Sequence, residues 1–210
     1  MLISEEITEF IRNMEPTNHV ILFYDSPESK RVILNTYIAD GLENGKGVLY
    51  ICSEETPDQI RDGLESFGID VEENMSEGRL LIRSYDPFYI KNGVVDPLRI
   101  INQWQEIYAE MEKKGLGLRV TGETSCFFKE GKVRDLMRYE YALHRVLSIP
   151  MEAICAYSIP IVVSTGYTDT IMPLIRANGG AIFTTGSGTM IVEPDAIEDY
   201  EVEKLLDIKI

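Results

Sequence analysis

The chain has few of the residues that build metal and disulfide sites: three cysteines and two histidines among 210 residues. Cys52, Cys126 and Cys155 lie far apart in the sequence, and none of them forms a C-x-x-C pair. This spacing argues against a disulfide framework and against a zinc site. Two histidines, His19 and His144, are too few for a histidine-rich metal centre. We therefore expect the protein to use neither a metal nor a cofactor.

Positive charge is also scarce, because 20 lysines and arginines stand against 35 acidic residues and give a formal net charge of −15. Such a chain lacks the electrostatic footprint that a nucleic-acid backbone requires, and an anionic membrane surface would repel it. No apolar run is long enough to span a membrane, and residues 1–14 look like an acidic amphipathic helix rather than a signal peptide. We expect a cytoplasmic protein with no direct nucleic-acid or membrane partner.

The phosphate-binding loops of nucleotide enzymes are missing. The first predicted strand-to-helix turn, "YDSPESK" at 24–30, contains no glycine, and its Asp25 and Glu28 would repel phosphate. The stretch "GLENGK" at 41–46 precedes a strand and lacks the hydroxyl residue of a P-loop. Neither G-x-G-x-x-G nor the nucleophile motif G-x-S-x-G occurs. We expect no hydrolysis of ATP or GTP and no enzymatic activity.

The segments that are present alternate between short apolar runs and amphipathic stretches. The runs predict strands, and the stretches, several of which begin with a capping residue and a proline, predict helices. Predicted strands cover 19–24, 47–52, 79–84, 118–122 and 153–157, and predicted helices cover 4–14, 26–45, 56–68, 96–115, 133–148 and 168–177.

This order indicates an α/β fold with a mostly parallel sheet and helices on both faces. "AIFTT" and "TMIVE" flank "GSG" at 186–188 and predict a closing hairpin, followed by an acidic tail helix. No linker-like segment interrupts the chain, so residues 1–210 are predicted to form one domain.

Parallel α/β sheets bind ligands outside the carboxyl ends of their strands. In "GLRVTGETSC", at 117–126, strand alternation places Arg119, Thr121 and Glu123 on one side. We expect Arg119 and Glu123 to belong to one polar cluster on the rim of a pocket at that edge. Tyr24 and Tyr157 stand at strand ends and would supply rings and hydroxyls, although either could be a simple rim residue.

The helix predicted over 133–148 carries a glutamate on its apolar face. Glu140 lies in the middle of the stripe, and His144 follows four residues later. A buried carboxylate needs a partner, so Glu140 is expected to face the core and to pair with His144 or Arg119. A purely structural ion pair explains this pattern as well as a functional one. His19 alone is more typical of a satisfied core histidine than of a ligand.

One stretch resembles a large ATPase class. "YICSEETPDQIRDGLESFGIDVEENMSEGRLLIRS", at 50–84, is similar to the RecA-like ATPases of the KaiC type. The resemblance implies that Glu54 and Glu55 match the turn of the catalytic glutamate. It also implies that Glu123 lies near the strand-end aspartate that helps to hold magnesium. The P-loop of that class is absent here.

A second resemblance, over roughly 15–160, is to the MEDS family, the sensory domain named after methanogens, methylotrophs and the regulator DcmR. It rests on "NHVILFYDS" (18–26), "ADGLENGKGVLYIC" (39–52), "LRVTGET" (118–124), "YEYAL" (139–143) and "AICAYS" (153–158). The family is regarded as a P-loop-less KaiC relative that senses small organic molecules of the hydrocarbon or one-carbon type. Its frequent H-x-C opening is His19-Val20-Ile21 here.

The resemblance implies a non-enzymatic sensory domain in signal transduction or transcriptional regulation. Residues 160–210 contain no helix-turn-helix or kinase motif, so output is expected through a protein partner or a homo-oligomer. Two alternatives stay open: a KaiC-like nucleotide-binding protein or ATPase with an altered phosphate site, and a pure interaction module that uses the acidic tail. The predicted ligand-binding residues are His19, Tyr24, Glu54, Arg119, Glu123, Glu140, His144 and Tyr157.

Overall fold

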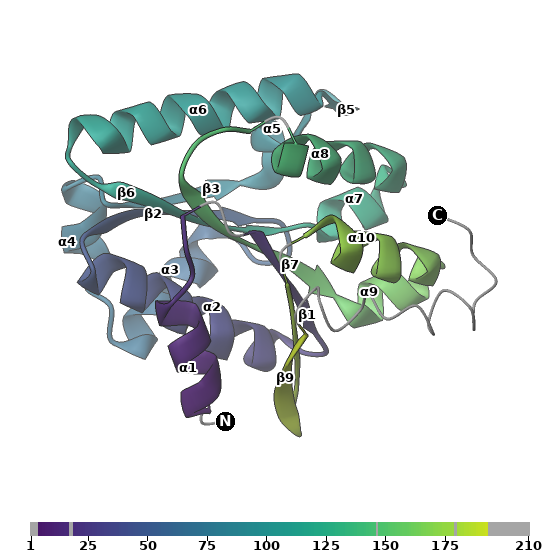
Figure 1. Cartoon of the computed structure of the whole chain (residues 1–210), viewed down its shortest axis with the longest axis horizontal. Coiled ribbons are helices and arrows are strands. Elements are labelled where there is room, and N and C mark those ends of the chain that lie inside the picture. The colour runs from purple at the N-terminus through teal and green to yellow at the C-terminus, as the bar shows by residue number, and fades with distance from the viewer. Residues whose placement is uncertain (1–3, 17–18, 146, 179, 193–210) are drawn as a thin grey trace.

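A seven-stranded sheet forms the centre of the protein in this computed structural model, which describes residues 4–16, 19–145, 147–178 and 180–192 (Figure 1). The strand order is β3-β2-β6-β7-β1-β8-β9, and all neighbours are parallel except the final pair, β8 and β9. The strands are β1 (His19–Tyr24), β2 (Lys46–Cys52), β3 (Leu80–Ser84), β6 (Gly117–Glu123), β7 (Met151–Ser158), β8 (Ala181–Thr185) and β9 (Gly188–Val192).

Helices cover both faces of this sheet (Figure 1). One face carries α1 (Glu5–Arg12), α2 (Pro27–Glu43), α3 (Pro57–Phe67) and α4 (Val71–Ser76). The other face carries α6 (Pro97–Lys113), α7 (Ser125–Lys129), α8 (Val133–Arg145), α9 (Ile159–Ser164) and α10 (Ile171–Ala177). The short helix α5 (Tyr85–Phe88), the hairpin β4 (Ile90–Lys91) and β5 (Val94–Val95), and the 3-10 turn η1 (Thr168–Thr170) complete the described elements.

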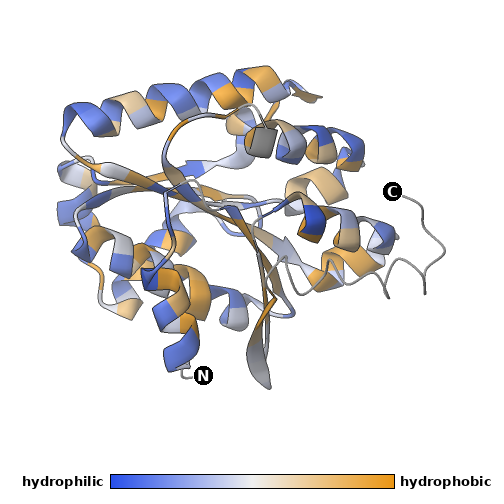
Figure 2. Ribbon diagram, viewed as in Figure 1, coloured by the Kyte–Doolittle hydropathy of each residue, from blue (hydrophilic) through white to orange (hydrophobic). Residues whose placement is uncertain are grey.

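Each face of the sheet has its own hydrophobic core, because residues alternate between the two sides along every strand. In β1, Val20, Leu22 and Tyr24 pack toward α2, whereas Ile21 and Phe23 pack toward the opposite layer. The central strands are buried on both sides, which explains their unbroken apolar runs. Hydrophobic residues accordingly follow the strands in Figure 2.

The parallel strands bring their carboxyl ends to a single edge. Strands β1, β2, β6 and β7 end at Tyr24, Cys52, Glu123 and Ser158. Close packing reaches into this edge at Gly122, where a Cβ atom would overlap the hydroxyl of Tyr89. Because these parallel strands are neighbours in the sheet, the turns that follow them lie next to one another. Side chains of these turns form the candidate site.

The predicted α/β architecture, the parallel sheet and the closing hairpin are confirmed. The helix predicted over 168–177 begins as the 3-10 turn η1 and becomes α-helical only at Ile171. The elements α4, α5, β4, β5, α7 and α9 were not predicted, because most are too short to show a clear periodicity. The predicted acidic tail helix lies outside the described residues.

Candidate functional site

Glu123, the last residue of β6, is the centre of a polar cluster at the carboxyl edge. Its side chain is fully buried, and its Oε1 accepts hydrogen bonds from Lys30 Nζ at 2.5 Å and from the Tyr50 hydroxyl at 2.8 Å. Its Oε2 accepts from the backbone N–H groups of Ser53 and Glu54, each at 2.6 Å. Four donors on one carboxylate compensate for its burial and fix the β2–α3 turn against β6.

Lys30 is the cation of this cluster. Helix α2 begins with a capping box between Ser26 and Ser29 and with Pro27, which places Lys30 in the first helical turn. The side chain is buried and pairs with Glu123 and, at 3.0 Å, with Glu55. Burial favours the neutral amine, but the charges of the nearby glutamates, Glu123 first, outweigh it and raise the pKa of Lys30. The amine therefore stays charged and is no nucleophile.

Glu55 continues the same chain of charges toward the surface. It pairs with the buried Lys30 and with the half-exposed Arg31 of α2. Burial opposes its ionisation, but the hydrogen bonds from Arg31 and Lys30 lower the pKa of Glu55. Glu123, Lys30, Glu55 and Arg31 thus alternate in sign, and both cations of this group already have carboxylate partners.

Glu54 differs from its neighbours because it has no ion-pair partner among the described residues. Its Oε1 accepts hydrogen bonds from the Tyr24 hydroxyl and, at 2.6 Å, from Ser125 Oγ. Burial, and after it the charges of Glu54 and Glu123, raises the pKa of Tyr24, so that the phenol remains a donor. Two buried hydroxyls therefore orient one oxygen of this half-buried carboxylate.

The prediction that Arg119 shares a cluster with Glu123 is wrong. Arg119 lies near the amino end of β6, where its guanidinium binds Glu152 at 2.6 Å and Asp40 at 2.7 Å. It also donates to the Tyr37 carbonyl and lies 4.6 Å from the centre of the Tyr37 ring. The predicted alternation is confirmed, because Arg119 and Glu123 both reach α2. The two residues are nevertheless four positions apart in the strand, which is about 13 Å along the sheet.

Glu140 faces the core, as predicted, but its partner is not Arg119. It lies on α8, whereas Arg119 points to the opposite face of the sheet. The Tyr157 hydroxyl donates to Glu140 Oε1 at 2.6 Å, and burial raises the pKa of Glu140. The alternation of β7, which turns Cys155 and Tyr157 to the same face, was the signal that could have found this pair. The side chain of His144 lies outside the described residues.

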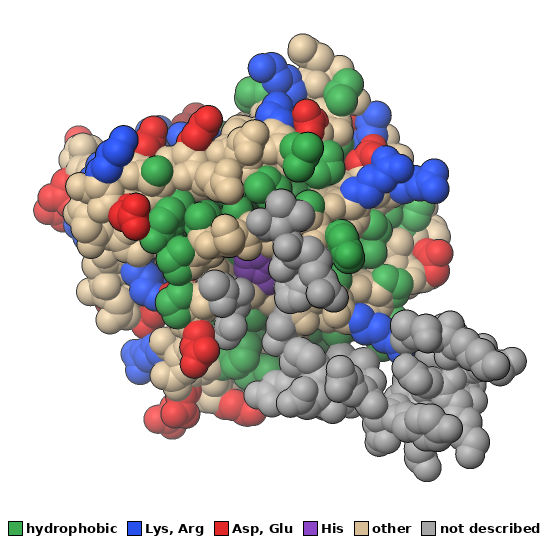
Figure 3. Space-filling view, turned by 45° about the horizontal axis from the view of Figure 1, so that its top comes forward, with side chains coloured by type: hydrophobic (Ala, Val, Ile, Leu, Met, Phe, Trp, Pro, Cys, Tyr) green, Lys and Arg blue, Asp and Glu red, His purple; other side chains and the backbone are tan. Residues whose placement is uncertain are grey.

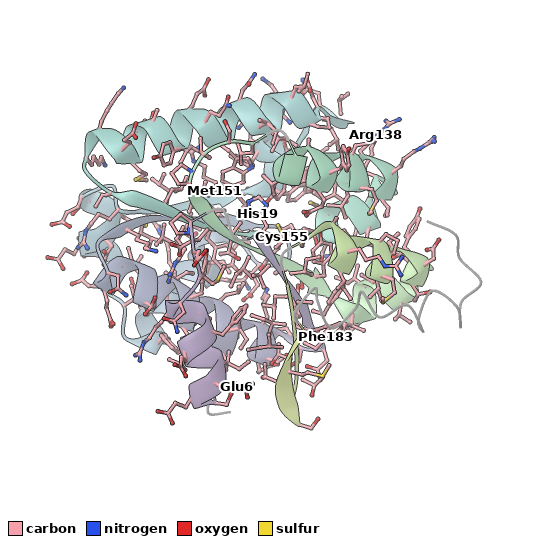
Figure 4. The ribbon with its side chains drawn as sticks, in the orientation of Figure 1. Glu6, His19, Arg138, Met151, Cys155 and Phe183 are labelled. Atoms are coloured by element: carbon pink, nitrogen blue, oxygen red, sulfur yellow. The ribbon has the colours of Figure 1, made fainter. Side chains whose placement is uncertain are left out.

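The eight predicted ligand residues therefore do not form a single group. Tyr24, Glu54 and Glu123 meet at the carboxyl edge on the α2 side, and Glu140 and Tyr157 meet on the α8 side. His19 is buried at the amino end of β1, beside the start of β7, where Figure 4 labels Met151. The sequence did not indicate Ser125, which follows Glu123 by two residues and begins α7.

Several cavities lie away from the carboxyl edge. A cavity of about 490 Å³ at the amino edge is lined by Arg12, Lys46 and Arg119 among others. Another, of about 460 Å³, lies between α3 and α4. Within the described part of the chain, no three histidine, cysteine or acidic side chains are arranged to hold a metal ion, and no helix is both long and apolar enough to cross a membrane.

Comparison with solved structures identifies the fold. A KaiC-like protein from the hyperthermophilic archaeon Pyrococcus horikoshii OT3 matches with a TM-score of 0.62 and 15% sequence identity. The match covers 85% of this chain and 79% of the other. At this identity the likeness shows the KaiC-like, RecA-like fold and nothing about activity.

Comparison with protein families identifies the sequence. No curated protein sequence matches the chain. The model of the family described as the MEthanogen/methylotroph, DcmR Sensory domain matches residues 18–171, which is most of the chain. This chain therefore belongs to the MEDS family of sensory domains.

Proposed function

We propose that this MEDS domain is a non-enzymatic sensor that binds a small organic molecule at the carboxyl edge of its sheet. The observation that carries the proposal is that Lys30 is buried and already ion-paired. A nucleotide site needs a cation that is available to phosphate, and Lys30 is buried between Glu123 and Glu55. The charge of Lys30 is thus neutralised by internal ion pairs at the place where a phosphate would need a free positive charge.

Glu54 is the residue of this edge best prepared to meet a ligand. Tyr24 and Ser125 hold one of its oxygens, and none of the described cations pairs with its carboxylate. Polar groups that are oriented before binding lower the entropic cost of capturing a ligand. We assign Glu54 to ligand contact and Glu123 to positioning, because Glu123 fixes the turn through two backbone N–H groups.

A thermal-shift screen of the full chain tests the proposal. The panel contains small alcohols, amines and halogenated compounds, with ATP–Mg²⁺ as the nucleotide arm. A ligand that binds the folded state raises the melting temperature in proportion to RT ln(1 + [L]/Kd). We expect a shift from an organic compound, none from ATP–Mg²⁺, and no magnesium-dependent turnover.

Two substitutions test whether the ligand that causes the thermal shift binds at Glu54. Glu54→Gln should abolish the ligand shift, whereas Glu28→Gln, at an exposed acid in the first turn of α2, should leave it intact. A stabilising shift from ATP–Mg²⁺ together with turnover that Glu54→Gln or Glu55→Gln abolishes would establish the KaiC-type alternative instead.

A further inference from the structure

The segment from the end of α7 into α8 is a local exception in an acidic protein. Residues 129–138 contribute four cations, Lys129, Lys132, Arg134 and Arg138, against two acids, Glu130 and Asp135. The chain as a whole has 20 basic and 35 acidic residues. Lys and Arg side chains gather on the right of the molecule in Figure 3, and Arg138 points outward from α8 in Figure 4. We call Arg134, Arg138 and Tyr141 the basic stripe.

The members of the basic stripe are spaced so that they share one side of the helix. Positions separated by four and then three residues lie above one another on an α-helix. Arg134 and Arg138 are exposed, and Tyr141 is 63% exposed. Arg138 forms a pair at 3.2 Å with Asp135, and Arg134 has no ion-pair partner among the described residues. Arginine and tyrosine are the residue types that interfaces prefer.

The last segment of the given sequence has the opposite charge. Residues 193–210, which lie outside the described part of the chain, carry seven acids and two lysines, a formal balance of −5 before the terminal carboxylate. The acids are Glu193, Asp195, Glu198, Asp199, Glu201, Glu203 and Asp207, and the lysines are Lys204 and Lys209. Ile197 and Tyr200 supply apolar groups among them.

We propose that the basic stripe of α8 is the docking site for the chain's own acidic segment 193–210. Reach does not limit this contact, because 18 residues extend to about 60 Å, whereas a domain of this size is roughly 40 Å across. Tethering gives such a segment a millimolar effective concentration, far above that of a free partner. The contact would link the end of β9 to the helix that carries Glu140, independently of whether the carboxyl edge binds a ligand.

Amide exchange with water, measured by NMR on the full chain, tests the proposal. In the wild-type protein at low salt, amides of 193–210 should exchange more slowly than in Arg134→Glu/Arg138→Glu, by roughly fivefold to tenfold for a few exposed ion pairs. Salt at about 1 M, where the Debye length is roughly 3 Å, should give the same acceleration in the wild type. The control Arg61→Glu/Lys113→Glu makes the same change in net charge elsewhere on the surface and should have no effect.

A variant in which the charges of the two partners are swapped makes the test specific. Adding Glu201→Lys and Glu203→Lys to Arg134→Glu/Arg138→Glu should restore the slow exchange, because the two partners then attract again. Equal exchange rates in the wild type and in Arg134→Glu/Arg138→Glu would overturn the proposal. Protection that appears only at high protein concentration would also overturn it, since it would assign the stripe to a second copy.

Discussion

Glu140 is a carboxyl group whose ionisation is opposed by the fold. It is buried with the Tyr157 hydroxyl as donor, and the pKa of Glu140 is raised by burial. Below about pH 4.3, the pKa of a glutamate in the unfolded chain, the carboxyl is protonated in both the folded and the unfolded state. Its burial then costs no ionisation free energy. As the pH rises from there toward the folded-state pKa, the unfolded chain releases the proton first, and stability falls.

The substitution Glu140→Gln should remove this pH dependence. The wild type is expected to lose about 1.4 kcal/mol of unfolding free energy for each unit by which the fold raises the pKa. The neighbouring Tyr157, Cys155 and Tyr139 have raised pKa values and stay neutral over this range. Urea unfolding across pH measures the effect, with Glu110→Gln, at an exposed acid, as control. Parallel profiles for the wild type and Glu140→Gln would show that Glu140 ionises freely.

Arg119 is expected to matter for stability and not for ligand binding. Arg119→Met leaves Asp40 and Glu152 without their buried cation, although the more exposed Arg12 and Lys46 still contact them. Removing one partner of a buried pair costs about 3–5 kcal/mol. Denaturant unfolding should show this loss, while the thermal shift caused by a bound ligand should persist. A stable Arg119→Met protein that no longer responds to ligand would return Arg119 to the binding site.

At the scale of elements, the turn between β2 and α3 depends on Glu123. Glu123→Gln keeps the shape of the side chain but removes the negative charge that pairs with Lys30. It also replaces one of the two oxygens that together accept four hydrogen bonds. We expect a loss of about 2–4 kcal/mol of unfolding free energy. Amide exchange at Ser53 and Glu54 should quicken, whereas exchange in the centre of β7 should follow only the global change. Unchanged exchange at Ser53 and Glu54 would refute the role of Glu123 as a clamp.

The helices and strands also show what could be predicted from the sequence and what could not. Apolar runs such as "HVILFY" identify buried parallel strands, and capping pairs such as Thr56 with Gln59 identify helix starts, so the sheet and the long helices were predictable. Helices such as α7, with five residues, have too little periodicity to be read. Side-chain partners depend on tertiary position, which is why Glu123 was assigned to the right edge while the partners of Arg119 were not.

For the molecule as a whole, the central claim is that a ligand binds at the carboxyl edge of the sheet. A RecA-like fold can use the carboxyl edge of its sheet, yet this protein also has a cavity of about 490 Å³ at the opposite edge. The most direct measurement is an NMR titration of the full chain with an organic compound that raises its melting temperature. We predict the largest shift changes at 24–26, 53–55 and 123–125. Changes confined to Arg12, Asn44 and Lys46, or to the groove between α3 and α4, would contradict the account.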